Sequence, residues 1–134
     1  MINKDAIVAC LQEHGYELES RSKNPQYQCM GFEKKNSSGT INIDFIEEKE
    51  GNLCRFGICF ALTESKVPQI LNIAKGLDFT STIWQKKKNA KKFYYFTFPL
   101  IKSGINVNSL TEGLNHLEKF IYEIHRIESS EGSS

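Results

Sequence analysis

The chain has 134 residues, which suits one domain that can bury a core without disulfides or a structural metal. Apolar residues make up 40% and charged residues 25%, as in ordinary globular domains. The formal net charge of +1 excludes a chain that is basic throughout, so only a local cluster of lysines could favour nucleic acid. Because no apolar run could span a membrane and the N-terminus lacks a signal-peptide core, we expect a cytoplasmic protein that does not bind membranes.

The N-terminal region predicts a helix and then a loop. Residues 3–14 place apolar side chains at helical spacing, with Asn3 as a good N-cap. Gly15 follows where a left-handed C-cap residue is common, and His14 suits the negative end of the helix dipole. Residues 16–25 are polar, and we expect them to form a loop before the first strand.

An antiparallel meander is predicted for the next part of the chain. It consists of three strands joined by short polar turns, at residues 26–34, 40–48 and 53–62. The second strand alternates most clearly, because Ile41, Ile43 and Phe45 fall on one face. Asn42 and Asp44 fall on the other face, so the sheet has one apolar and one more polar side.

A helix, a hairpin and a long helix complete the predicted order. Ser65 is expected to cap the first of these helices, with Pro68 in its first turn. A hairpin with strands at residues 79–87 and 92–98 follows. Ser109 and Glu112 predict a capping box for the last helix. Its apolar residues keep helical spacing: Val107, Leu110, Leu114, Leu117, Ile121 and Ile124.

The predicted order of elements is therefore α-β-β-β-α-β-β-α. The economical arrangement is a single α+β domain over residues 1–128, with a five-stranded, mainly antiparallel sheet and three packing helices. Residues 129–134 are polar and predict a disordered tail.

Residues 79–100 give the strongest indication of binding. They contain seven aromatic residues and five lysines, and the predicted hairpin is apolar on both faces. A sheet with one face in water does not need a second apolar face, so a helix, a second copy of the chain or a ligand must cover it. The predicted partner-binding residues are Trp84, Phe93, Tyr94, Tyr95 and Phe96.

The tip of this hairpin supports a different interpretation. It concentrates five cations: Lys86, Lys87, Lys88, Lys91 and Lys92. Lysines can neutralise phosphates while a neighbouring aromatic ring stacks on a base, so nucleic acid is an alternative partner. Lysines on an edge strand also prevent sheets from pairing with one another, and that structural role stays open beside the binding role.

Motifs for enzymatic chemistry are sparse. The sequence contains no HExxH, P-loop, GxGxxG or GxSxG motif. Acidic residues near Lys49 have the E-x-K spacing of metal-dependent nucleases, with Glu33 as a further candidate ligand: Asp44, Glu47 and Glu48. Acidic turns beside strands are common, however, and we expect a non-enzymatic protein without cofactor or metal. A metal-dependent nuclease is the remaining enzymatic alternative.

The thiols and imidazoles do not form ligand pairs in the sequence. The chain has no CxxC pair among its four cysteines, Cys10, Cys29, Cys54 and Cys59. Without a secretion signal, we expect free and mostly buried thiols. His116 and His125 are nine residues apart on the last predicted helix, so they lie on nearly opposite sides and cannot bind one metal together.

Two stretches resemble a known family. Residues 2–19, INKDAIVACLQEHGYELE, are similar to the first helix and the glycine–aromatic step of type III secretion chaperones and the related YbjN-type domains. Residues 93–121, FYYFTFPLIKSGINVNSLTEGLNHLEKFI, resemble the last strand, loop and closing helix of that family. The resemblance implies a non-enzymatic, often dimeric protein that binds an extended peptide along its sheet.

The leading hypothesis is thus a protein-binding module, chaperone-like or regulatory, that uses an apolar sheet surface. Its partner would be a protein or peptide, and a homodimer on the same surface is a further expectation. The alternative is a nucleic-acid-binding accessory or phage-conflict protein that uses the lysine-rich hairpin tip.

Overall fold

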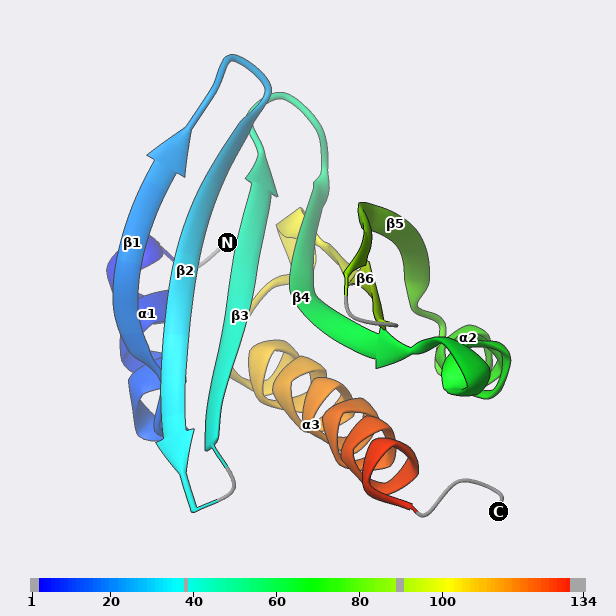
Figure 1. Ribbon diagram of the computed structural model, residues 1–134. Coiled ribbons are helices and arrows are strands. Elements are labelled where there is room, and N and C mark those ends of the chain that lie inside the picture. Colours follow the sequence, from blue (N-terminus) through cyan, green and yellow to red (C-terminus); the bar gives the residue numbers. More distant parts are fainter. Residues whose placement is uncertain (1–2, 38, 89–90, 131–134) are drawn as a thin grey trace.

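Six antiparallel strands and three α-helices make up the computed structural model (Figure 1). It describes residues 3–37, 39–88 and 91–130, without the side chains of residues 84–88. The first half comprises α1 (Lys4–Glu13), β1 (Glu17–Lys23), β2 (Tyr27–Asn36), β3 (Gly39–Glu48) and β4 (Leu53–Thr63). The second half comprises α2 (Val67–Gly76), β5 (Thr80–Lys88), β6 (Lys91–Ile101) and α3 (Val107–Ser129). Short 3₁₀ turns precede α2 and α3, at Glu64–Lys66 and Lys102–Gly104.

The prediction of an α+β fold with three helices and an antiparallel sheet is confirmed, but the sheet has six strands instead of five. Their spatial order is β1-β2-β3-β4-β6-β5. The predicted loop at residues 16–25 is wrong, because Glu17–Lys23 forms β1 and pairs with β2. As an edge strand, β1 leaves nearly all of its side chains exposed, so its sequence lacks the apolar alternation by which strands are recognised.

The starts of α1 and α2 show how far local sequence signals predict the first residue of a helix. The N-cap prediction for α1 is confirmed, since the Ala6 amide donates to Asn3 Oδ1 at 2.8 Å. Gly15 follows that helix with φ +90°, the left-handed conformation that glycine permits. Ser65 does not cap α2, because it lies in the preceding 3₁₀ turn and α2 begins at Val67.

A correction also applies to the start of α3. Its N-cap is Asn106 instead of Ser109, and the two residues bond reciprocally: the Ser109 amide donates to Asn106 Oδ1 at 2.8 Å and the Asn106 amide donates to Ser109 Oγ at 2.9 Å. Val107, expected in the apolar stripe, is the first helical residue and is 52% exposed. The rest of the stripe is buried as predicted. The helix runs to Ser129, into the segment expected to be a tail.

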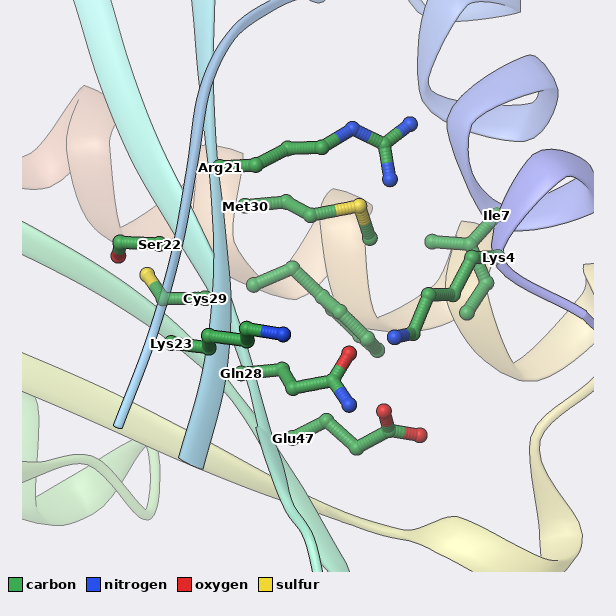
Figure 2. A pocket seen from close by; sticks show the side chains of 10 residues that line it. Lys4, Ile7, Arg21, Ser22, Lys23, Gln28, Cys29, Met30 and Glu47 are labelled. Carbon is green, nitrogen blue, oxygen red and sulfur yellow. The ribbon is translucent and has the colours of Figure 1, made fainter. Parts of the chain in front are cut away.

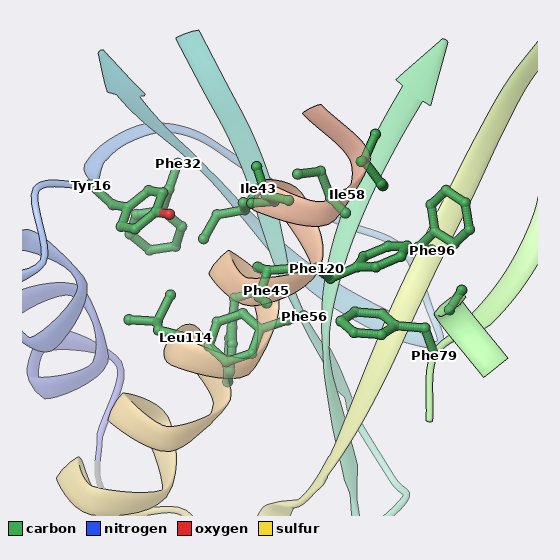
Figure 3. Close-up of a cluster of buried hydrophobic side chains, with 14 of the residues drawn as sticks. Tyr16, Phe32, Ile43, Phe45, Phe56, Ile58, Phe79, Phe96, Leu114 and Phe120 are labelled. Carbon is green, nitrogen blue, oxygen red and sulfur yellow. The ribbon is translucent and has the colours of Figure 1, made fainter. Parts of the chain in front are cut away.

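The helices bury one face of the sheet, called here the covered face. Its buried side chains belong to one core with residues of all three helices (Figure 3): Met30, Phe32, Ile43, Phe45, Cys54, Phe56, Ile58, Leu62, Tyr94 and Phe96. The Phe120 ring of α3 lies 4.9 Å from that of Phe96 and 4.4 Å from that of Phe79. A Cβ atom on Gly113 would lie 2.9 Å from Phe56, so glycine lets α3 approach the sheet. Where α3 lies on the sheet, the covered face is therefore filled by the chain itself.

Candidate functional site

The alternate residues of the same strands form a second surface, called here the uncovered face. Within the described ranges, no helix packs on it (Figure 1). The pairing register places its residues in rows across the strands, and one central row runs Gly31, Asp44, Gly57, Thr97. Beside that row Cys59 pairs with Tyr95. Tertiary pairing thus gathers polar and aromatic groups from four strands.

A tyrosine is held in place at the centre of the uncovered face. The Tyr95 hydroxyl donates to Asp44 Oδ2 at 2.7 Å, reaching from β6 across β4 to β3. Its ring passes over Gly57, where a Cβ atom would lie 2.6 Å from Tyr95 Cζ. A residue with a Cβ atom could not occupy this position unless the tyrosine ring moved. The Asp44–Tyr95 contact therefore requires glycine at position 57.

Burial shapes the protonation of this pair. Burial raises the pKa of Asp44, and the hydrogen bond from Tyr95 acts in the opposite direction. Burial, followed by the hydrogen bond and charge of Asp44, raises the pKa of Tyr95 far above its ordinary value. Tyr95 therefore remains a protonated donor over the physiological range, and the contact persists as a fixed structural feature.

Two cysteines flank the pair on the same face. Cys59 is exposed and Cys29 is half-buried, whereas Cys10 and Cys54 are buried, and all four are free thiols. The expectation of free thiols is thus confirmed, whereas the expectation that they are mostly buried holds only for Cys10 and Cys54. Burial and, next, the charge of Asp44 raise the pKa of both Cys29 and Cys59. A raised pKa disfavours the thiolate, so the environment of Cys29 and Cys59 opposes a role of either thiol as a nucleophile.

One end of the uncovered face is apolar, and we call it the apolar corner. It consists of five side chains around Arg55: Tyr27, Ile46, Leu53, Pro99 and Ile101. Tyr27 is 37% exposed and Ile101 is 56% exposed. A hollow of about 320 Å³ lies between Tyr27, Ile46 and Arg55, with Asn24 and Cys29 at its border. Large apolar side chains that remain in water beside a hollow are typical of contact surfaces.

The structure separates the predicted partner-binding residues. Phe93 and Tyr95 lie half-buried on the uncovered face, as the alternation of the hairpin predicts. Tyr94 and Phe96 belong to the core, with 6% and 0% exposure, so their assignment to a partner surface requires correction. The cause is α3, whose Phe120 covers this side of β6. The side chain of Trp84 lies outside the described residues.

The lysine-rich tip is described only in part. Lys91 is exposed and Lys92 is half-buried at the start of β6. Lys86, Lys87 and Lys88 belong to β5 by their backbone, and their side chains lie outside the described residues. The register pairs Lys88 with Lys91, which places two residues of like charge opposite each other.

The acids considered for a nuclease site are dispersed. Asp44 and Glu47 lie on opposite faces of β3, and Glu47 has Lys102 Nζ at 3.9 Å. Glu48 accepts from the Leu53 amide at 3.3 Å, and Glu33 has Lys35 Nζ at 3.7 Å. Among the residues that the structure describes, no three His, Cys, Asp or Glu side chains form a group that could hold a metal ion.

The two histidines of α3 have separate packing roles. The His116 ring stacks on Phe79 with centroids 5.4 Å apart, and one of its nitrogens contacts the Leu77 carbonyl oxygen. His125 packs edge-on against Phe60 at 6.1 Å. As predicted from their spacing, they do not share a site.

Comparison with known proteins indicates a shared fold and indicates no function. No family model matches the chain, and no curated protein matches it either. A crystal structure of an uncharacterized protein from Methanothermobacter thermautotrophicus is similar, with a TM-score of 0.62 and 10% sequence identity. The match covers 96% of this chain and 100% of that chain. Separately, none of the helices in the described ranges is both long and apolar enough to cross a membrane.

Proposed function

We propose that the chain is a non-enzymatic protein-binding module, chaperone-like or regulatory, that takes an apolar segment of another protein on its uncovered face. One observation carries this proposal. Tyr95 is fixed over Gly57 by its bond to Asp44, on a face where no described helix packs. A side chain held in this way loses little conformational freedom when a partner binds.

The composition of the face supports a protein partner. Aromatic residues and arginine are enriched at the centres of protein interfaces, and here Phe93 and Tyr95 accompany Arg55 of the apolar corner. Tyr27 and Ile101 add apolar area that the chain leaves in water. The resemblance to peptide-binding chaperones points in the same direction and remains a hypothesis.

Site-specific photo-crosslinking in the native host tests the proposal. A photoreactive phenylalanine analogue replaces Phe93 on the uncovered face or, as a matched control, Tyr122, which is 66% exposed on α3. We expect a discrete cross-linked protein from position 93 and none from position 122. The product should diminish when Arg55→Glu is added, because a charge of opposite sign is then placed in the apolar corner.

Different outcomes of this experiment are decisive. Equal cross-linking from both positions, or a product indifferent to Arg55→Glu, would contradict the proposal. A product of twice the chain's mass would identify the partner as a second copy of the chain, which analytical ultracentrifugation of the purified protein would then have to show as a dimer.

The lysine-rich tip supports the alternative of nucleic-acid binding. Like charges on paired residues, here Lys88 and Lys91, destabilise a hairpin unless an anion lies near them. If the alternative holds, affinity for single-stranded DNA falls steeply with salt and is lost when Lys86, Lys87, Lys88, Lys91 and Lys92 are changed to glutamine. Unchanged affinity in that variant, measured by fluorescence anisotropy, would remove the alternative.

A further inference from the structure

A cavity of about 310 Å³ lies between α1 and the strands β1, β2 and β3. Its floor consists of Met30 and Phe45 from the covered face and Ile7 from α1. These three side chains are 1%, 6% and 2% exposed, so the floor is apolar and little of it meets solvent. The volume falls at the lower end of small-molecule pockets, which span roughly 300–1,000 Å³.

Cationic side chains surround this apolar floor. The cavity is lined by Lys4 from α1 and by Arg21 and Lys23 from β1 (Figure 2). Among the described residues, none of the three has a carboxylate partner within ion-pair distance. Three cations around one small space repel one another, and an anion placed between them would relieve that repulsion.

The acid at the cavity does not supply this anion. Among the described lining residues the carboxylate is Glu47, which is 9% exposed and lies at the end that Gln28 also borders (Figure 2). Lys102 Nζ is 3.9 Å from Glu47 Oε2, so this charge already has a partner. The chain as a whole carries a net charge of only +1, and the excess of positive charge here is local.

We propose that this cavity binds a small organic anion with an apolar body, of the class of medium-chain or aromatic carboxylates. The apolar body lies on Ile7, Met30 and Phe45, and the carboxylate faces Arg21 and Lys23. The guanidinium group presents a planar pair of donors that matches a carboxylate. The floor is on the opposite side of the sheet from Tyr95, so the site does not depend on the protein-binding proposal.

Calorimetric titration with octanoate tests the proposal. We expect saturable binding to one site, weakened about tenfold or more in the double variant Arg21→Gln/Lys23→Gln. The matched control is Lys75→Gln/Lys119→Gln, which removes two exposed charges from helices away from the cavity and should leave affinity unchanged. Because all four positions are exposed or on edges, both variants should keep the thermal unfolding midpoint of the parent chain. Glu47→Gln should tighten binding, since it removes the negative charge.

Two further probes separate the two parts of the ligand. Octanol keeps the alkyl chain of octanoate without its charge, and inorganic phosphate keeps a negative charge without an alkyl chain. Each should bind at least about tenfold more weakly than octanoate. Amide chemical shifts should move at Ile7, Met30 and Phe45. Any of three results would overturn the proposal: chemical-shift changes centred on Tyr95, equal affinity of the two double variants for octanoate, or phosphate binding as tight as octanoate binding. Equal affinity for octanol would show that the lysines and arginine merely cover the apolar floor.

Discussion

The two faces of one sheet use similar aromatic residues in opposite ways. On the covered face, Phe56 and Phe96 are fully buried against α3 and contribute to a single core. On the uncovered face, the Tyr95 ring passes over Gly57 and its hydroxyl donates a hydrogen bond to Asp44, while Phe93 remains half-buried. A helix replaces water on one side, whereas on the other side the chain fixes its side chains without covering them. The difference shows that the number of apolar side chains alone does not define an interface. Whether a helix of the same chain packs on a face decides whether its aromatic residues form core or remain available to a partner.

The largest effect is expected from the covered face. Phe120→Ala removes a ring that is 0% exposed and contacts both Phe79 and Phe96, so we expect a loss of about 3–5 kcal/mol in the free energy of unfolding. Phe93→Ala on the uncovered face is the control, with an expected loss of under about 1.5 kcal/mol because its ring is only half-buried. Urea unfolding measures both, and equal losses would break the distinction between the faces.

A smaller effect is expected from Gly57→Ala. The added methyl group would collide with the Tyr95 ring and push it off the sheet, which should cost about 1–3 kcal/mol. In the background Tyr95→Ala the same change should cost much less, because the colliding ring is absent. A double-mutant cycle measures this coupling, and additive losses would show that Tyr95 does not lie across Gly57.

The hydrogen bond itself is expected to contribute less. Tyr95→Phe keeps the ring and removes the donor to Asp44, so we expect a loss of about 1 kcal/mol in urea unfolding. Tyr94→Phe is a matched control on the covered face of the same strand. If cross-linking from position 93 also falls in Tyr95→Phe while the fold is retained, the fixed tyrosine is part of the contact surface.

The smallest expected effect is a pH dependence. Burial raises the pKa of Asp44 above its unfolded value of 3.8, so the folded state holds this proton more tightly than the unfolded chain. Its contribution to stability is fully present below that value and is lost as pH rises through the raised folded pKa. Relative to the parent chain, Asp44→Asn should therefore gain stability as pH rises through the raised pKa of Asp44, as measured by thermal unfolding. A relative loss would mean that the folded-state pKa is lowered.

Sequence patterns were sufficient for elements with a strong period and insufficient for those without one. The alternation around Ile43 and Phe45 predicted both faces of β3, and the spacing around Leu114 and Leu117 predicted the buried side of α3. β1 was missed because an exposed edge strand needs no apolar alternation. The true cap of α3, Asn106, competes with Ser109 at the level of sequence, since both residue types cap helices well.

The candidate sites were even less accessible to sequence. Phe93 and Tyr95 could be placed on one face of the hairpin, but the partner-binding assignment of Tyr94 and Phe96 failed because nothing local indicates that α3 covers them. The contact between Asp44 and Tyr95 joins residues 51 positions apart, and the cavity of about 310 Å³ combines residues of α1 with residues of β1. Such contacts follow from the order of strands and helices in space.

The sequence by itself determined the α+β class, three helices, the alternation of five strands and the residues that form most of the core. These features depend on local periodicity and on the burial of apolar side chains. Both can be recognised within one stretch of sequence, without knowledge of its neighbours in space. Only the tertiary structure decided that β1 closes one edge of the sheet, that α3 covers one face, and that Tyr95 rests on Gly57 beside Asp44. Those outcomes depend on which distant elements pack together, because covering and close approach are properties of pairs of elements.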